Sequence, residues 1–230
     1  LMSKAAAGRV AAIIPAAGLG VRLGADIPKA FLELGGLSLL TRSAHAMSAV
    51  ADVIIASVPE DALAQASLQL AEVDAEIHIV AGGVHRQESV AMALRKVPQD
   101  VTIVLVHDAA RPLVPIKVAQ DVVAAIRNGA KAVIPVLPLV DTIKRVNNKG
   151  IAIETVDRNQ LRRVQTPQGF DRATLDLAYE DPAVVATDDA ALMDALGIVV
   201  ETVAGDERGL KITTMDDVRY AISFLEDSHE

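Results

Sequence analysis

Apolar residues in this chain form short runs that alternate with longer segments of helical periodicity. The runs are rich in Val, Ile and Ala, as the strands of buried parallel sheets usually are. Five runs predict strands: Val10–Pro15, Val53–Val58, Ile77–Val80, Val101–Val106 and Ala132–Val136. Four intervening segments predict helices: Ser38–Ala49, Glu60–Leu70, Gln87–Lys96 and Ile116–Asn128. The alternation predicts an α/β fold, with a mainly parallel twisted sheet flanked by helices and joined by right-handed crossovers.

One segment departs from this alternation. Asp141–Val146 and Ile151–Val156 alternate apolar and polar side chains on either side of an Asn-Asn-Lys-Gly turn, which is typical of a β-hairpin. The remaining predicted elements are helices at Asp171–Tyr179 and Asp188–Leu196, a strand at Ile198–Val203 and a helix at Met215–Leu225. We therefore expect residues 1–230 to form a single domain into which a projecting hairpin arm is inserted at about 139–157.

Composition and charge narrow the class of protein. Hydrophobic residues make up 51% of the chain, so intrinsic disorder is excluded. Aromatic residues make up only 2%, and the net charge is -8, so we expect neither nucleic acid nor an anionic membrane as a partner. The absence of Cys excludes a disulfide framework, a thiolate zinc site and a Cys nucleophile. With no leader pattern and no apolar run near the ~20 residues that span a bilayer, we expect a cytoplasmic location.

The loop after the first predicted strand carries the clearest candidate chemistry, since ligands of parallel sheets bind at the carboxyl ends of strands. It reads Pro-Ala-Ala-Gly-Leu-Gly-Val-Arg-Leu-Gly over residues 15–24, with Lys29 shortly after. Small residues let backbone N–H groups approach a phosphate, and Arg22 and Lys29 add two cations. A P-loop would end in Gly-Lys-Ser/Thr, and a dinucleotide fingerprint would have Gly at Leu23, so both are excluded. A glycine-rich turn with solvated cations is the alternative.

Later motifs extend this pattern along the chain. They are Gly82-Gly83-x-x-Arg86-x-x-Ser89-Val90, the run 106–112 (Val-His-Asp-Ala-Ala-Arg-Pro), Asp141-Thr142-Ile143-Lys144, Arg158-x-x-Leu161, the run 165–170 (Gln-Thr-Pro-Gln-x-Phe), Thr187-Asp188-Asp189 and Lys211-Ile212-Thr213. In order and spacing, from residue 10 to about 220, they resemble the 2-C-methyl-D-erythritol 4-phosphate cytidylyltransferases of the non-mevalonate isoprenoid pathway.

The resemblance implies a Rossmann-like nucleotidyltransferase that transfers CMP from CTP to 2-C-methyl-D-erythritol 4-phosphate and releases pyrophosphate. The implied CTP contacts are Ala16, Ala17, Gly18, Gly20, Gly82, Gly83, Arg86, Ser89, Asp108 and Ala109. The implied catalytic residues are Arg22, Lys29, Arg158 and Lys211, and the implied acceptor contacts are Arg111, Thr142, Arg158, Thr166 and Lys211. A Mg²⁺ ion would be held mainly by the CTP phosphates, with Asp108 as its candidate protein ligand. The arm would embrace a second subunit, which implies a homodimer with shared sites.

Several positions keep an alternative role. The reaction needs no strong base, because a phosphate is already an anionic nucleophile, so we expect His107 to be structural. Asp108 and Arg111 could pair with each other, while Ser89 and Lys211 could be an ordinary helix residue and an ordinary surface lysine. Two positions depart from the family pattern: Val84 replaces a residue that is polar in many relatives, and Gly209 replaces the usual Asn.

Other functions remain as alternatives at this level. A cytidylyltransferase for another polyol phosphate, such as ribitol 5-phosphate, would carry similar loops. A non-catalytic nucleotide-binding protein is disfavoured by the presence of Arg22, Lys29 and Lys211, and a dinucleotide-dependent oxidoreductase by the missing third Gly.

Overall fold

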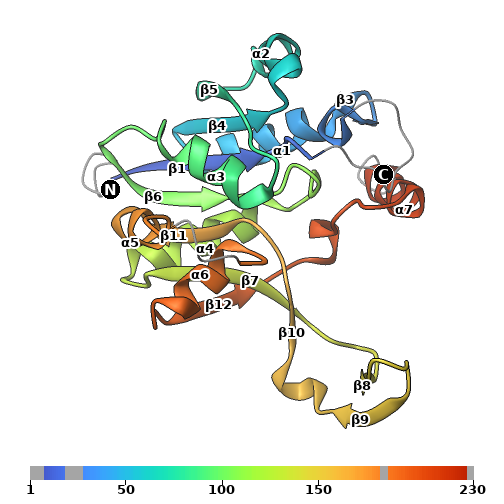
Figure 1. The fold of residues 1–230 in the computed structure, drawn as a ribbon. Coiled ribbons are helices and arrows are strands. Elements are labelled where there is room, and N and C mark those ends of the chain that lie inside the picture. The colour runs from blue at the N-terminus through green and yellow to red at the C-terminus, as the bar shows by residue number, and fades with distance from the viewer. Residues whose placement is uncertain (1–7, 19–27, 182–185, 227–230) are drawn as a thin grey trace.

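A computed structural model describes residues 8–18, 28–181 and 186–226 of the chain. Its centre is an eight-stranded sheet in the order β10-β7-β11-β6-β1-β4-β5, with β12 also paired to β7 (Figure 1). The strands are β1 (Arg9–Pro15), β4 (Val53–Val58), β5 (Glu76–Ala81), β6 (Val101–Val106), β7 (Ala132–Pro138), β10 (Arg162–Val164), β11 (Gln168–Asp171) and β12 (Val200–Ala204). The pairs β1–β4, β1–β6, β4–β5 and β7–β12 are parallel, whereas β10 and β11 run antiparallel to their neighbours.

Helices cover both faces of this sheet. One face carries α1 (Leu39–Ser48), α2 (Leu63–Leu70) and α4 (Ile116–Arg127), and the other carries α3 (Arg86–Leu94), α5 (Arg172–Ala178) and α6 (Asp189–Ala195). A smaller apolar cluster joins α7 (Met215–Glu226) to the short hairpin of β2 (Glu33–Leu34) and β3 (Leu37–Ser38). Short 3₁₀ turns are η3 (Lys29–Phe31), η4 (Glu60–Ala62), η5 (Arg158–Gln160) and η6 (Glu207–Gly209). None of the helices within the described ranges is long and apolar enough to cross a lipid bilayer.

Strand β1 shows why this segment folds as a central strand. Successive side chains of a strand point to opposite faces of its sheet. Val10, Ala12 and Ile14 accordingly pack into the core beneath α1, α2 and α4, while Ala11 and Ile13 pack into the core beneath α3. All five are fully buried. A continuous apolar run is therefore required here, because neither face of the strand meets water.

The structure confirms the predicted α/β alternation and corrects some of its elements. All five strands predicted from apolar runs are present, and the predicted helix Glu60–Leu70 is divided into η4 and α2. The prediction missed β11, whose sequence Gln-Gly-Phe-Asp has no apolar run. Gly169 allows this strand to lie close to α4, since a Cβ there would be 2.3 Å from Cγ1 of Val122. It also missed β10 and the β2–β3 hairpin, which are only two or three residues long.

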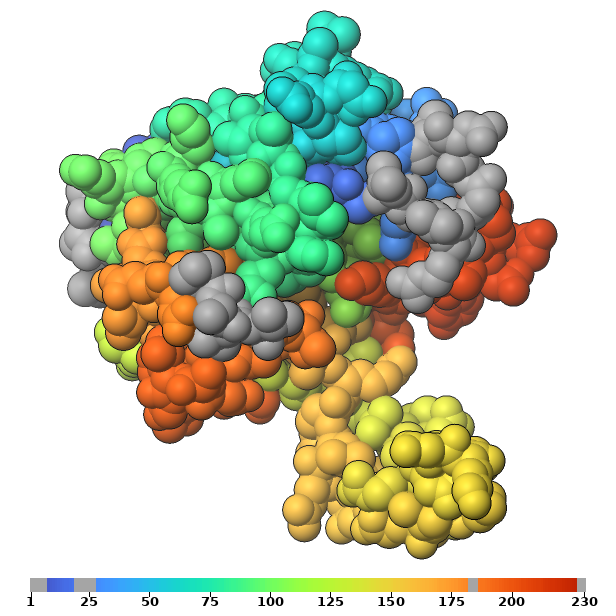
Figure 2. Space-filling model, in the orientation of Figure 1, coloured from blue at the N-terminus to red at the C-terminus, as the bar shows by residue number. Residues whose placement is uncertain are grey.

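The predicted hairpin forms a separate arm. Strands β8 (Ile143–Val146) and β9 (Ala152–Val156) pair antiparallel as a two-stranded sheet of their own. The arm projects from the body of the protein, connected through the ends of β7 and β10 (Figures 1 and 2). Apolar side chains remain exposed on it, among them Val140, Val146, Ile151 and Ile153.

Replacing Phe170 tests the contribution of the inserted strand β11. The ring is fully buried in the core beneath α3, α5 and α6. We expect Phe170→Ala to lower the free energy of unfolding by about 3–5 kcal/mol, because it leaves a cavity in a packed core. Chemical denaturation measures this loss. Leu177→Ala on α5 is the control: that side chain is half exposed, and a comparable loss there would contradict the assignment.

Candidate active site

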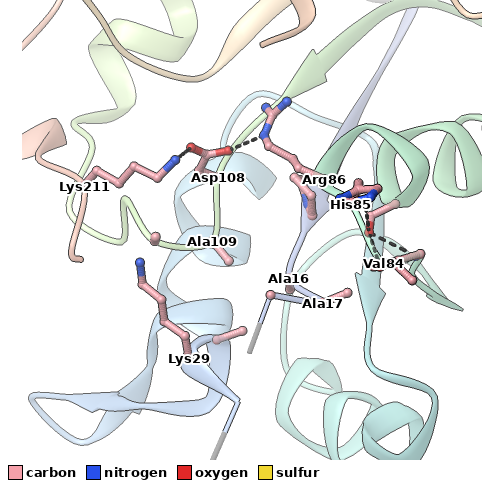
Figure 3. Close-up of a pocket in the computed structure, with 15 residues that line it drawn as sticks. Ala16, Ala17, Lys29, Val84, His85, Arg86, Asp108, Ala109 and Lys211 are labelled. Carbon is pink, nitrogen blue, oxygen red and sulfur yellow. Dashed lines mark hydrogen bonds and ion pairs between the residues drawn. The ribbon is translucent and has the colours of Figure 1, made fainter. Parts of the chain in front are cut away.

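A pocket opens at the carboxyl ends of the central strands, where the sequence predicted ligand binding (Figure 3). Four segments far apart in the sequence meet there: the loop after β1, the loop between β5 and α3, the loop after β6, and the segment that follows η6. Its lining consists of Pro15, Ala16, Ala17, Gly18, Lys29, Ala30, Gly83, Val84, His85, Arg86, Ser89, Asp108, Ala109, Ala110 and Lys211. The structure therefore brings together most of the residues assigned to CTP in the sequence.

The first two loops are in direct contact, and this contact requires glycine. A Cβ on Gly82 would lie 2.5 Å from Cβ of Ala17 and 2.9 Å from Oγ of Ser89. Oγ of Ser89 also accepts a hydrogen bond from the N–H of Gly83, at 3.1 Å. The side chain of Glu88 accepts the N–H groups of Val84 and His85 at the start of α3. These contacts hold the second loop in one conformation, whereas the Val84 side chain projects into solvent and is 89% exposed.

Asp108 lies between two cations. Its Oδ1 atom is 2.9 Å from Nε of Arg86, and its Oδ2 atom is 2.7 Å from Nζ of Lys211. In Figure 3, Lys211 and Arg86 reach this carboxylate from opposite sides, while Lys29 extends toward the same region from below. The ion pair between Asp108 and Arg111 that the sequence left open is not formed. Asp108 pairs with Arg86 and Lys211 instead.

Burial and charge act in opposite directions on Asp108. Burial would raise the pKa of this carboxyl, but the nearby charges of Arg86 and Lys211 outweigh burial and hold the pKa well below its usual range. Asp108 is therefore ionised at neutral pH. Burial alone would lower the pKa of Arg86, yet Asp189 and Asp108 together raise it above its usual value.

A hydrogen-bonded chain lies behind the loop after β6. The N–H of Asp108 donates to Oγ1 of Thr166 at 3.1 Å, and that hydroxyl lies 3.0 Å from Nδ1 of His107. Nε2 of His107 lies 3.2 Å from the carbonyl oxygen of Arg111, so this nitrogen carries the proton. Nδ1 is then free to accept the Thr166 hydroxyl proton, which makes the neutral imidazole the form that satisfies every partner. Thr166 and His107 are both buried and support the pocket from behind.

Burial lowers the pKa of His107 from 6.5 to about 4. A neutral, fully enclosed imidazole holds the loop and has no route to a substrate proton. The structure thus places His107 in the supporting role expected from the sequence.

Arg111 is used to connect segments of the chain. Its Nη1 and Nη2 atoms donate to the carbonyl oxygens of Gly209 at 2.7 Å and Val164 at 3.3 Å. The loop after β6 is thereby tied to β10 and to η6. Gly209 fits closely here, because a Cβ at this position would lie 3.1 Å from Nε2 of Gln165.

Some residues named from the sequence lie elsewhere. Thr142 lies between β7 and β8, and Arg158 lies in η5, which follows β9 of the arm. Neither lines the pocket of its own chain, and Arg158 donates to the carbonyl oxygen of Val140. Gly20 and Arg22 fall outside the described residues. Asp189 belongs to one of the sequence motifs, but no role was predicted for it. Its carboxylate, 1% exposed, lies 2.7 Å from Nη1 of Arg86.

The described residues do not form a resident metal site. They contain no group of three or more His, Cys, Asp or Glu side chains that could hold a metal ion. Among the described residues that line the pocket, Asp108 is the only carboxylate, and both of its oxygens are already paired with cations. A Mg²⁺ ion would therefore need most of its ligands from substrate phosphates and water, which is its usual mode of binding.

A mainly parallel sheet, a first loop of small residues and two lysines at the carboxyl ends of its strands define a nucleotidyltransferase with a Rossmann-like fold. A family model described as 2-C-methyl-D-erythritol 4-phosphate cytidylyltransferase matches residues 10–227. The chain belongs to this family.

Individual relatives agree with this assignment. The 2-C-methyl-D-erythritol 4-phosphate cytidylyltransferase of Saccharopolyspora erythraea is 46% identical over 222 residues, covering 94% of this chain and 99% of that protein. The crystal structure of the enzyme of that name from Thermus thermophilus is 34% identical with a TM-score of 0.79, covering 94% and 98% of the two chains. The 4-diphosphocytidyl-2C-methyl-D-erythritol synthase of Anaerococcus prevotii is 28% identical with a TM-score of 0.85, covering 96% and 97%.

The buried neutral His107 predicts a specific dependence of stability on pH. Between its unfolded pKa of 6.5 and its folded pKa of about 4, the unfolded state binds the proton more strongly, so stability falls as pH decreases through this window. At about 1.4 kcal/mol per pKa unit, the shift corresponds to about 3 kcal/mol.

Denaturation of the wild type and of His107→Asn between pH 7 and pH 4 measures this contribution. The other titrating groups contribute equally to both proteins, so the difference between their slopes isolates the imidazole. We expect the variant to lose less stability than the wild type over the window. Parallel curves would contradict the assignment.

Proposed function

We propose that this chain transfers CMP from CTP to 2-C-methyl-D-erythritol 4-phosphate, giving 4-diphosphocytidyl-2-C-methyl-D-erythritol and pyrophosphate. The observation that carries the proposal is the pocket itself, where a loop of small residues lies beside Lys29, Lys211 and Asp108. Backbone N–H groups and lysines at strand ends suit a triphosphate better than they suit a neutral ligand. The membership of the chain in the family supports the same substrates.

The phosphate of the acceptor attacks the α-phosphorus of CTP in line, and pyrophosphate leaves. Two polyanions must approach each other, so catalysis consists mainly of positioning and electrostatic stabilisation. Lys29 and Lys211, together with Arg22 from the first loop, balance charge that develops on the α-phosphate and on the leaving group. Gly18 and Gly20 let the backbone approach the phosphates closely.

The second loop serves base recognition in this proposal. Gly82, Gly83 and Ser89 present backbone and hydroxyl groups to the cytosine edge, and the contacts of Glu88 and Ser89 hold that loop in place. Asp108 and Ala109 lie next to the nucleotide, and Ala16 and Ala17 leave room for it. Arg86 contributes by fixing Asp108.

Mg²⁺ enters this proposal with CTP as part of the substrate. The ion would neutralise charge on the triphosphate, and Asp108 could reach it only by exchanging one of its present partners. No step of this mechanism depends on a metal held by the protein.

The arm supports the proposal of a homodimer with shared sites. A two-stranded sheet is marginally stable by itself, and the exposed apolar residues of this arm favour a covering partner. Thr142 and Arg158 would then reach the acceptor site of the second subunit, where Arg can grip a phosphate with two donors. Each acceptor site would thus combine Thr142 and Arg158 from the arm of one subunit with Thr166 and Arg111 from the body of the other subunit. The body and its inserted arm would form one domain.

Pyrophosphate release tests the function. Purified protein should release pyrophosphate with CTP and 2-C-methyl-D-erythritol 4-phosphate, and far more slowly with UTP, ATP or GTP, because the second loop contacts the base edge. Ribitol 5-phosphate is the control acceptor. Equal turnover with UTP would refute the assigned cytosine contacts, and preference for ribitol 5-phosphate would refute the acceptor.

Mixed dimers test whether the site is shared. We expect Lys29→Ala to lower kcat about a hundredfold or more, as the loss of one transition-state donor commonly does. We expect Arg158→Ala to remain dimeric and to bind 2-C-methyl-D-erythritol 4-phosphate poorly, with little change in its affinity for CTP. In a dimer of one subunit of each kind, one site carries both defects and the other site is intact. Such dimers, isolated with two different tags, should regain about half of the normal activity per dimer. No recovery would show that Arg158 serves its own subunit or that the arms do not pair.

A further inference from the structure

A network of charges extends from the pocket into the interior of the protein. From Lys211 it runs through Asp108 to Arg86, whose Nη1 atom lies 2.7 Å from Oδ2 of Asp189. The hydroxyl of Tyr179 donates to Oδ1 of Asp189 at 2.5 Å. The chain of contacts thus joins the pocket to Tyr179, the C-cap of α5, and to α6, and neither helix contributes a residue to the described pocket lining.

Asp189 is the most enclosed member of this network. Its side chain is 1% exposed, compared with 10% for Asp108 and 28% for Arg86. A carboxylate buried this deeply is stable only when it is paired and hydrogen-bonded, and Arg86 and Tyr179 supply those partners. Burial and the neighbouring Asp189 also raise the pKa of Tyr179, so Tyr179 remains a neutral donor.

The guanidinium of Arg86 is divided between two carboxylates. Nη1 meets Asp189, which leaves Nε for Asp108. Because the guanidinium is planar and rigid, fixing one edge of it also fixes the direction of the other edge. Asp108 is thereby engaged through Oδ1 only, and Oδ2 remains available to orient Lys211.

We propose that Asp189 is a positioning residue, which acts through Arg86 and Asp108 to hold Lys211 in its catalytic place; the kinetic part of this inference rests on the proposed function. Without the charge of Asp189, Nη1 of Arg86 has no anionic partner, and the guanidinium can rotate to present one edge, with two N–H donors, to both oxygens of Asp108. Asp108 would then release Lys211. The sequence motif Thr187-Asp188-Asp189 gave no role to Asp189, and its ion pair with Arg86 supplies one.

Asp189→Asn tests the proposal, because the amide keeps the size of the side chain and can still accept the Tyr179 hydroxyl. We expect kcat to fall about tenfold to a hundredfold, as small misplacements of catalytic groups do. The KM for CTP should change little. The stoichiometry of CTP binding, measured by titration calorimetry, corrects kcat for any inactive protein.

Asp188→Ala is the matched control. Asp188 is the neighbouring carboxylate, and it accepts the N–H of Ala191 and a hydrogen bond from Gln168 without contacting Arg86. Its loss removes the N-cap of α6 and destabilises the same region, but kcat per binding site should be unchanged. An equal fall of kcat in the two variants would overturn the proposal in favour of a purely structural role.

A double variant supplies a second criterion. If Asp189 acts only through Arg86, adding Asp189→Asn to Arg86→Gln should cause no further loss of kcat. It should even restore stability, since it removes a buried charge that has lost its partner. Independent, additive losses of kcat would overturn the proposal.

A structural readout separates this inference from the proposed function. In a crystal structure of Asp189→Asn, Nζ of Lys211 should have left hydrogen-bonding distance of Asp108, and retention of that contact would overturn the proposal. This result does not depend on which reaction the wild type catalyses. Wild-type protein that binds CTP but releases no pyrophosphate would refute the function alone.

Discussion

The pocket depends on one constraint, which is that the carboxylate of Asp108 must stay charged in a place with little access to water. Two cations satisfy it, and they come from distant parts of the chain: Arg86 begins α3, and Lys211 follows η6 near the C-terminus. Neither could be removed without leaving a buried charge. The ion pairs therefore join segments that the sheet alone would not connect. In a chain of net charge -8, they also compensate the negative charge of Asp108 at the place where a polyphosphate is to bind.

Rigidity is the second property that this arrangement provides. The contact of Gly82 with Ala17 leaves no space for a larger residue, Ser89 and Glu88 hold the second loop, and Thr166 supports the backbone at Asp108. A reaction between two phosphates requires little covalent chemistry from the protein, so accurate placement of donors is the main contribution it can make. The enclosed His107 fits this view, since it is used to hold a loop and not to move a proton.

The sequence predicted the elements whose signal is local. Continuous apolar runs are sufficient to identify the parallel strands, because such strands are buried on both faces, as β1 illustrates. Small residues followed by Lys29 likewise marked the first loop of the pocket. Strand β11 could not be found in this way, because its place depends on the fit of Gly169 against Val122 of another element. The ion-pair partner of Asp108 could not be identified from the sequence either. Arg111 is nearby in sequence, whereas Arg86 reaches Asp108 only after α3 has packed on the sheet.

The position of Tyr179 makes the charge network accessible to absorption and fluorescence spectroscopy. The chain contains no Trp and only two Tyr, so its near-ultraviolet absorption and intrinsic emission come almost entirely from Tyr179 and Tyr220. The two rings lie in different surroundings: Tyr220 is 55% exposed on α7 beside Phe224, whereas the hydroxyl of Tyr179 is bound to the buried carboxylate of Asp189. A hydrogen bond from a phenol to a carboxylate alters both absorption and emission of the ring. The protein thus carries a native chromophore at the inner end of its charge network, and a rearrangement there can be followed spectroscopically without any label.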